Sequence, residues 1–199
     1  MRIIAGKFKG RRLAAPKGNT VRPTADRVKE SVFSILREQV VNANFLDLCA
    51  GTGSIGIEAL SRGAKHVTFV EREPQCIRVI KRNLAACNLT VARGPVPRAG
   101  YQLTTEQHVR LLRCPISKGI SQLQRCAPFD IIYFDAPYHA GLYTDSLASL
   151  AHANLLCAHG SLLIEHSKQT SLPLTVGELT QDRQETYSNT HVSFYRMRG

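Results

Sequence analysis

Apolar residues recur along this chain with two periods, about 3.6 and about 2 residues, which are the periods of helices and strands. From Thr24 onward the period is helical. Thr24 is placed to cap a helix, Asp26 falls in its first turn, and the apolar stripe consists of Val28, Val32, Phe33, Leu36 and Val40. The pattern predicts an amphipathic helix that carries Arg27 outside its apolar stripe.

Beyond Asn44, short apolar runs alternate with helical segments. The predicted strands are FLDLC (45–49), HVTFVE (66–71), HVRLL (108–112), DIIYFD (130–135) and SLLIEH (161–166), followed by an antiparallel hairpin of QETYS and HVSFYRM. Helices are predicted over 54–63, 74–88, 117–125 and 141–152, and residues 90–107 are expected to form a loop insertion. This alternation is typical of an α/β fold with a parallel sheet and helices on both faces.

The first 23 residues have a different pattern. RIIAG and GRRLA are short β-like pieces around Lys7-Phe8-Lys9-Gly10, and a loop, PKGNTVRP, follows them. We therefore expect a basic N-terminal hairpin and linker over residues 1–23 and one α/β domain over residues 24–199. A chain of 199 residues is long enough for such a domain to bury a substantial core.

Positive charge is concentrated in the same N-terminal region. The chain carries a net charge of +11, and residues 1–25 contain seven Lys and Arg but no Asp or Glu. Such a segment is often only a solvated basic face, but it also suits a polyanion, because Lys and Arg neutralise phosphates. The candidate RNA-binding residues are Lys7, Lys9, Arg11, Arg12 and Arg27.

Several classes of protein are disfavoured by what the sequence lacks. The six cysteines include no CxxC pair, so we expect reduced thiols and no metal site. No run of 18 apolar residues and no secretory leader is present, which predicts a cytoplasmic protein without membrane contact. A basic leader is also typical of a transit peptide, but its glycines and Pro16 interrupt the amphipathic helix that such a peptide needs. We expect a monomer.

A glycine-rich turn supplies the first chemical motif. Gly51, Gly53 and Gly56 form a GxGxxG string directly after a predicted strand, and Glu71 ends the next strand. Glycines let the backbone approach a ligand, and an acid at that position can accept hydrogen bonds from a ribose. A tight turn that binds nothing would show the same string, and a nicotinamide dinucleotide site would also use it.

Asp47 distinguishes between these ligands. A carboxylate on a buried strand four residues before the first glycine would repel a pyrophosphate, whereas S-adenosyl-L-methionine carries a sulfonium and an ammonium. Here FLDLCAGTGSIGIEALSRGA and FVERE resemble the first two motifs of class I S-adenosylmethionine-dependent methyltransferases. The resemblance implies that the methionine end is held by Asp47, Ala50, Gly51, Thr52 and Gly53, and the ribose end by Glu71 with Arg72 beside it.

A second motif, Asp135-Ala136-Pro137-Tyr138, follows the fourth predicted strand. A carboxylate and a fixed carbonyl that accept both N–H bonds of a nucleobase amine would localise its lone pair toward a methyl donor, and Tyr138 offers a stacking face. The string resembles the (Asp/Asn)-Pro-Pro-(Tyr/Phe) motif of amino-methyltransferases, with Ala136 in place of the first proline. The alternative is an ordinary turn in which Asp135 caps the following helix.

Longer stretches resemble, in order, the RsmD family of bacterial 16S rRNA guanine-N2 methyltransferases: RIIAGKFKGRRL, RPTADRVKESVFSIL, both motifs above, LLIEHS and HVSFYR. The resemblance implies a Rossmann-like class I methyltransferase fold with a mostly parallel seven-stranded sheet and a small N-terminal β-hairpin that helps to hold RNA. It also implies that Arg22 and Thr24 fold over the cofactor. The expected substrate is guanine 966 of 16S rRNA, free or in the 30S subunit.

The chain departs from this family in two places. The 90–107 loop is long, and Arg113-Cys114-Pro115-Ile116 stands where the family often has an acid or amide near the adenine, so the adenine contact stays open. Two other functions fit part of the pattern. A catalytically impaired RNA-binding protein would explain Ala136, and a DNA amino-methyltransferase would use the same chemistry, although 199 residues leave little room for a target-recognition region.

Overall fold

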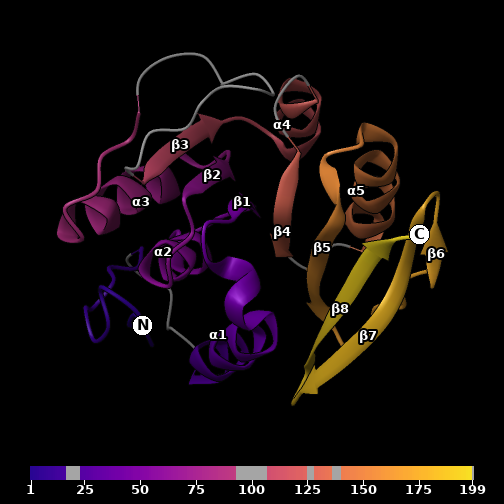
Figure 1. Cartoon of the computed structure of the whole chain (residues 1–199), viewed down its shortest axis with the longest axis horizontal. Coiled ribbons are helices and arrows are strands. Elements are labelled where there is room, and N and C mark those ends of the chain that lie inside the picture. The colour runs from indigo at the N-terminus through magenta and orange to yellow at the C-terminus, as the bar shows by residue number, and fades with distance from the viewer. Residues whose placement is uncertain (17–22, 93–106, 125–127, 136–139, 199) are drawn as a thin grey trace.

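The fold alternates strands and helices along the chain, as the computed structural model shows (Figure 1). It describes residues 1–16, 23–92, 107–124, 128–135 and 140–198. The helices are α1 (Pro23–Leu36), the short 3-10 helix η1 (Arg37–Val40), α2 (Ser54–Ser61), α3 (Pro74–Ala86), α4 (Ile116–Leu123) and α5 (Ala140–Ala153). The strands are β1 (Asn44–Leu48), β2 (His66–Glu71), β3 (His108–Arg113), β4 (Phe129–Asp135), β5 (Leu156–Ser167), β6 (Thr175–Val176), β7 (Leu179–Tyr187) and β8 (Thr190–Met197).

All of these strands form one sheet in the order β3-β2-β1-β4-β5-β8-β7-β6. The pairs from β3 to β5 are parallel, and β8, β7 and β6 add antiparallel pairs. The sheet is therefore mixed and eight-stranded, which corrects the expected seven. The additional strand, β6, has only two residues, Thr175 and Val176, and so is too short to show a period in the sequence.

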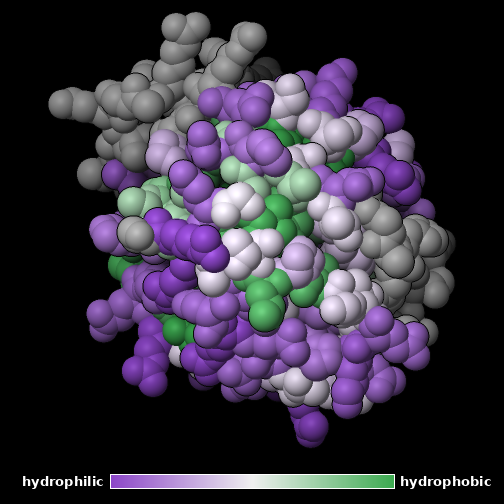
Figure 2. All heavy atoms as spheres, turned by 90° about the vertical axis from the view of Figure 1, so that its right-hand side faces the viewer, coloured by the Kyte–Doolittle hydropathy of each residue, from purple (hydrophilic) through white to green (hydrophobic). Residues whose placement is uncertain are grey.

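Helices cover both faces of the sheet, because apolar side chains point alternately to either side of the buried strands (Figure 1). On one face α1, α2 and α3 pack over the first core cluster, which includes Val32, Ile57 and Ile80. On the other face α4 and α5 pack over the second cluster, which includes Leu123 and Leu147. The side of the molecule formed by α5 and the last strands shows apolar side chains surrounded by hydrophilic ones (Figure 2).

Several predicted boundaries differ from the structure, most by one or two residues, and β7 begins at Leu179 instead of at Gln184. Helix α1 begins at Pro23 rather than after a Thr24 cap, since the fixed φ of proline suits the first helical position. Strand β5 begins at Leu156, which pairs with Phe129 before the register shifts, and the predicted strand over 161–166 is only its second half. The glycine and polar residues between the two halves hide the first half from a period count.

Residues 1–14, here called the leader, form an antiparallel loop with a single bridge, Arg2 to Arg12, rather than a hairpin of regular strands. Gly6 and Gly10 adopt φ of +82° and +83°, which lets the loop turn tightly. The leader's apolar side chains Ile3, Phe8 and Leu13 are buried in the first core cluster. The leader is thus part of the packed structure.

Candidate active site

The glycine turn connects β1 to α2 through a run of left-handed backbone. Cys49, Gly51 and Gly53 have φ of 59°, 55° and 74°, a region that costs little only for glycine. The amide of Gly53 donates to the carbonyl of Ala50 at 2.7 Å, and α2 begins at the next residue. The turn therefore presents backbone rather than side chains at the carboxyl edge of the sheet, where open α/β sheets bind ligands.

Glu71, at the end of β2, holds this turn from the side. Its Oε2 accepts the amide of Gly51 at 2.8 Å, and its Oε1 accepts the amides of Arg72 and Glu73 at 2.7 and 2.8 Å. A carboxylate has about four acceptor positions, so one lone pair of Oε2 is left for a ligand hydroxyl. The residue expected to bind a ribose is therefore already oriented at the turn.

Asp47 lies on β1, before the glycine turn, and is 2% exposed. Its Oδ2 accepts the amide of Gly56 at 2.9 Å. Burial raises the pKa of Asp47 to about 7, the bond from Gly56 opposes the shift, and the charge of Glu71 adds to it. A buried carboxyl in this state gains from a nearby cation.

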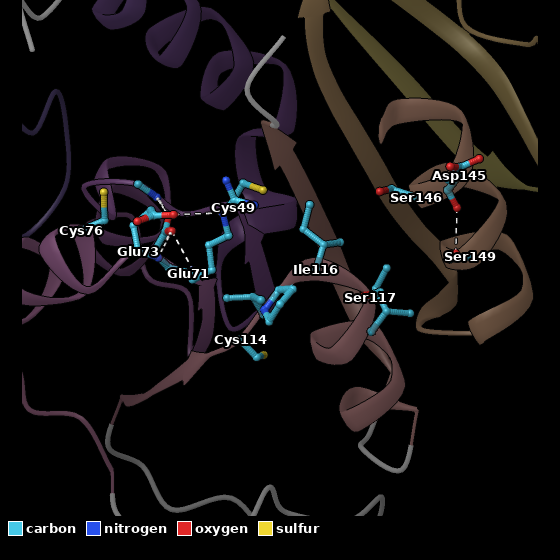
Figure 3. Close-up of a pocket in the computed structure, with 15 residues that line it drawn as sticks. Cys49, Glu71, Glu73, Cys76, Cys114, Ile116, Ser117, Asp145, Ser146 and Ser149 are labelled. Carbon is cyan, nitrogen blue, oxygen red and sulfur yellow. Dashed lines mark hydrogen bonds and ion pairs between the residues drawn. The ribbon is translucent and has the colours of Figure 1, made fainter. Parts of the chain in front are cut away.

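A cleft of about 510 Å³ opens beside the turn, between the ends of β1, β2 and β3 and helices α4 and α5 (Figure 3). It is lined by Cys49, Gly51, Val70, Glu71, Arg72, Glu73, Cys76, Cys114, Pro115, Ile116, Ser117, Ile120, Asp145, Ser146 and Ser149. Acidic groups stand at opposite ends and apolar side chains between them. This arrangement suits a flat, partly apolar molecule that carries hydroxyl or cationic groups.

The structure brings together only part of the predicted cofactor set. Gly51, Glu71 and Arg72 line the cleft, whereas Asp47, Ala50, Thr52 and Gly53 form the strand and turn behind it. Thr24 lies in the first turn of α1, and Arg22 falls outside the described residues. Sequence reasoning missed the wall formed by Cys49, Cys76, Ser117, Asp145, Ser146 and Ser149, since no periodicity or motif marks it.

Asp135 ends β4 at the same edge, in register with Glu165 of β5. Solvent reaches its side chain, yet the pKa of Asp135 is raised well above its ordinary value by desolvation among the surrounding protein and by the charges of Glu165 and Asp47. Tyr133 donates its hydroxyl to Oε2 of Glu165 at 2.5 Å. The rest of the predicted motif, Ala136, Pro137 and Tyr138, lies outside the described residues.

The predicted RNA-binding side chains are all exposed. Lys7, Lys9, Arg11 and Arg12 lie on the leader and Arg27 on α1. The cations of Lys7 and Arg11 each stand 5.5 Å from the ring centre of Phe8, within the range of a cation–π interaction, and both residues are exposed. Within the described ranges, no group of His, Cys, Asp and Glu is placed to hold a metal ion, and no helix is long and apolar enough to cross a bilayer.

Comparison with known proteins gives consistent matches over the whole chain. Residues 1–196 match the family described as Conserved hypothetical protein 95. A Bacillus subtilis protein, YlbH, named provisionally as an rRNA methyltransferase, is 36% identical over 200 residues, 100% of both chains. Ribosomal RNA small subunit methyltransferase D of Haemophilus influenzae is 32% identical over 172 residues, 86% of this chain and 81% of its own.

A solved structure agrees with these sequence matches. An Escherichia coli protein, yhhF, described provisionally as a methyltransferase, superposes with a TM-score of 0.78 at 29% identity. The match covers 99% of this chain and 97% of that one, so the architecture is shared from end to end.

Proposed function

Since the chain belongs to the RsmD family, whose members methylate rRNA of the small subunit, we propose that it methylates the exocyclic N2 amine of a guanine in 16S rRNA, at position 966. S-adenosylmethionine is the methyl donor. The observation that carries the proposal is the position of Asp135 at the end of β4, at the same sheet edge as the cleft beside Gly51 and Glu71. Donor and amine would meet at that edge.

The cleft residues fit the donor. About 510 Å³ lies within the range of small-molecule sites, roughly 300–1,000 Å³. Glu71 keeps a lone pair for a ribose hydroxyl, and Asp47 and the turn suit the positively charged methionine end. When bound, S-adenosylmethionine supplies a methyl group on a sulfonium, which is electrophilic without a metal.

The protein's part in the reaction is to orient the amine and manage its proton. The lone pair of an exocyclic amine is delocalised into the ring, so the amine attacks poorly by itself. The Asp135 carboxylate would accept one N–H of the amine and hold the lone pair toward the methyl carbon. As the N–C bond forms, the C–S bond breaks, and the proton leaves the nitrogen through Asp135 to water.

The leader supports an RNA substrate. Its exposed Lys and Arg side chains have no Asp or Glu among them. Lys and Arg that neutralise RNA phosphates provide affinity that does not depend on the base sequence. A guanine stacked in rRNA must be flipped or already unstacked to reach Asp135. Relatives named as small-subunit methyltransferases make 16S rRNA, free or within a 30S particle, the proposed partner.

Transfer of labelled methyl groups to undermethylated 30S subunits tests the proposal. The wild type should label 16S rRNA at a single guanine, found by nucleoside mass spectrometry and primer extension. Asp135→Ala should lower transfer by about 100-fold or more while the dissociation constant for S-adenosylmethionine changes little. Asp130→Asn, at the opposite end of β4, is the matched control. Equal turnover by Asp135→Ala would remove Asp135 from the mechanism, and no label with the wild type would reject the function.

A further inference from the structure

The outward face of α3 is basic. Arg78, Lys81 and Arg82 are exposed, and their spacing of three and four residues places them together on one side of the helix. The opposite side carries Ile77, Ile80 and Leu84, which are buried against the sheet. Packing therefore fixes which way the three cations face.

In the described part of the chain, no acidic side chain pairs with these charges. The whole stretch from Pro74 to Thr105 contains no Asp or Glu, which makes it the second acid-free basic segment after residues 1–25. None of the three cations forms an ion pair with another described residue. A cluster of unpaired cations costs electrostatic free energy unless a polyanion neutralises it.

The fold places this helix directly beside the leader (Figure 1). The guanidinium of Arg11 donates to the carbonyl of Ala86 at the end of α3. Asn83 accepts the amide of Ala14 at 2.8 Å and donates to the carbonyl of Ala14 at 3.1 Å and to that of Thr52 at 2.9 Å. Two basic segments about 70 residues apart in the sequence thus become neighbours, joined at the glycine turn.

We propose that the outer face of α3 and the leader form one continuous surface that binds the phosphodiester backbone of the substrate RNA. The surface is defined by Lys7, Lys9, Arg11, Arg12, Arg78, Lys81 and Arg82, and the inference rests on the proposed rRNA substrate. Helix α3 is about 20 Å long and begins at the rim of the cleft, where Cys76 lines it. RNA bound along this surface therefore passes the edge of the sheet at which Asp135 lies.

The test compares two triple variants of equal charge change. Arg78→Gln, Lys81→Gln and Arg82→Gln together remove the α3 charges while keeping a good helix former at each position. The control, Arg183→Gln with Arg196→Gln and Arg198→Gln, removes three cations from β7, β8 and the residue that follows β8. Binding to a short fluorescent RNA duplex and to undermethylated 30S subunits is measured from low to high salt, with calorimetry of S-adenosylmethionine alongside.

The α3 variant should bind RNA about tenfold or more weakly at physiological salt, with a salt slope smaller by about 2, since each lost phosphate contact lowers it by roughly 0.7–0.9. The control should keep the wild-type slope, and both should bind S-adenosylmethionine normally. An α3 variant with wild-type RNA affinity and slope would overturn the inference, while the methyl-transfer assay still judges the proposed function. Binding of the same variants to anionic lipid vesicles is measured as well. If the α3 variant lost vesicle binding while its RNA binding stayed unchanged, the inference would also be overturned, and the face would be assigned to a membrane surface.

Discussion

Asp135, at the end of β4, lies in register with Glu165 of β5, and we expect this pairing to influence the pH dependence of methyl transfer. Both pKa values are raised, that of Asp135 by desolvation and then by Glu165, and that of Glu165 by desolvation against the opposing bond from Tyr133. The proposed role of Asp135 requires its ionised form. Methyl transfer should therefore fall as pH decreases through the raised pKa of Asp135.

Glu165→Gln tests this coupling. Removing the adjacent negative charge lowers the pKa of Asp135, so the acidic limb of the pH–rate profile should move to lower pH. The measurement is single-turnover methyl transfer on 30S subunits across pH. Glu185→Gln, on β7, serves as the control and should leave the profile in place. A Glu165→Gln profile identical to the wild type would show that the two carboxyls are not coupled during transfer.

The buried carboxyl of Asp47 is expected to lower the stability of the fold at neutral pH while favouring the binding of a cationic cofactor. Its pKa is about 7 in the folded chain against an ordinary 3.8, so between these pH values the folded state holds a proton that the unfolded state has released. Its contribution to stability therefore declines as pH rises from about 4 to about 7. Asp47→Asn should raise the free energy of unfolding by about 1–3 kcal/mol at pH 8 and have little effect at pH 4.

The same variant should bind S-adenosylmethionine about tenfold more weakly, because it lacks the charge that suits a cation. Denaturant unfolding at the two pH values and calorimetry provide the measurements. An equal change in stability at pH 4 and pH 8 would contradict the proposed titration of Asp47.

At this scale the sequence predicts the residues that belong to short local motifs. Gly51 follows a recognisable strand, Glu71 and Asp135 each end one, and all three lie at the carboxyl edge of the sheet. Glu165 also ends an apolar run, but its pairing with Asp135 depends on strand order, which no local pattern states. Ser117 and Asp145 reach the cleft only through the packing of α4 and α5.

The βαβ element around the glycine turn depends on the third glycine of the motif for close packing. A Cβ at Gly56 would lie 2.3 Å from the ring of Phe69 on β2. Gly56→Ala should thus push α2 away from the sheet and lower the free energy of unfolding by about 1–3 kcal/mol. Because α2 begins at the glycine turn, the affinity for S-adenosylmethionine should fall together with the stability.

A double variant isolates the cause. Phe69→Leu shortens the side chain that blocks the new methyl group, so it should recover part of the stability lost in Gly56→Ala, measured as a double-mutant cycle in denaturant. Strictly additive losses would show that the contact with Phe69 is not the reason for the glycine.

Among elements, the long periodic ones are predicted from sequence and the short or interrupted ones are not. The βαβ alternation and the helices α2 to α5 follow from their patterns to within a few residues. The two-residue β6, the first half of β5 and the start of α1 differ because each is decided by pairing or proline geometry instead of periodicity. The leader lacks regular strands because the backbone amides of Ile4 and Ala5 donate to Glu58 of α2 instead of to a strand partner.

At the scale of the whole molecule, a buried carboxylate is one of the groups that hold the leader in place. Glu58, fully buried on α2, accepts the amides of Ile4 and Ala5 at 2.8 and 3.0 Å, and its Oε1 accepts Nε of Arg62 at 2.8 Å. The Nζ of buried Lys29 lies 3.8 Å from its Oε2 and donates to the carbonyl of Arg2. These contacts join the leader, α1 and α2 into a single unit.

Glu58→Gln should loosen this unit. An amide group would present N–H donors to the amides of Ile4 and Ala5 and remove the anion shared by Arg62 and Lys29, which leaves Lys29 with Asp26 at 3.7 Å as its acidic partner. Breaking a buried ion pair typically costs about 3–5 kcal/mol. Hydrogen exchange at Ile4 and Ala5 should accelerate, and RNA binding should weaken with the leader released. Glu30→Gln, an exposed change on α1, is the matched control. Unchanged exchange at Ile4 in a folded Glu58→Gln protein would show that other contacts hold the leader.

The leader's contacts also determine the order in which the molecule can be completed during synthesis. The leader is synthesised before α2 and α3, and its hydrogen-bond partners on these helices follow 53 to 75 positions later in the chain. Contacts of such sequence separation form late, since their loop-closure entropy must be offset by a unit that is already folded. The basic leader therefore lacks its packed position until α3 has been synthesised.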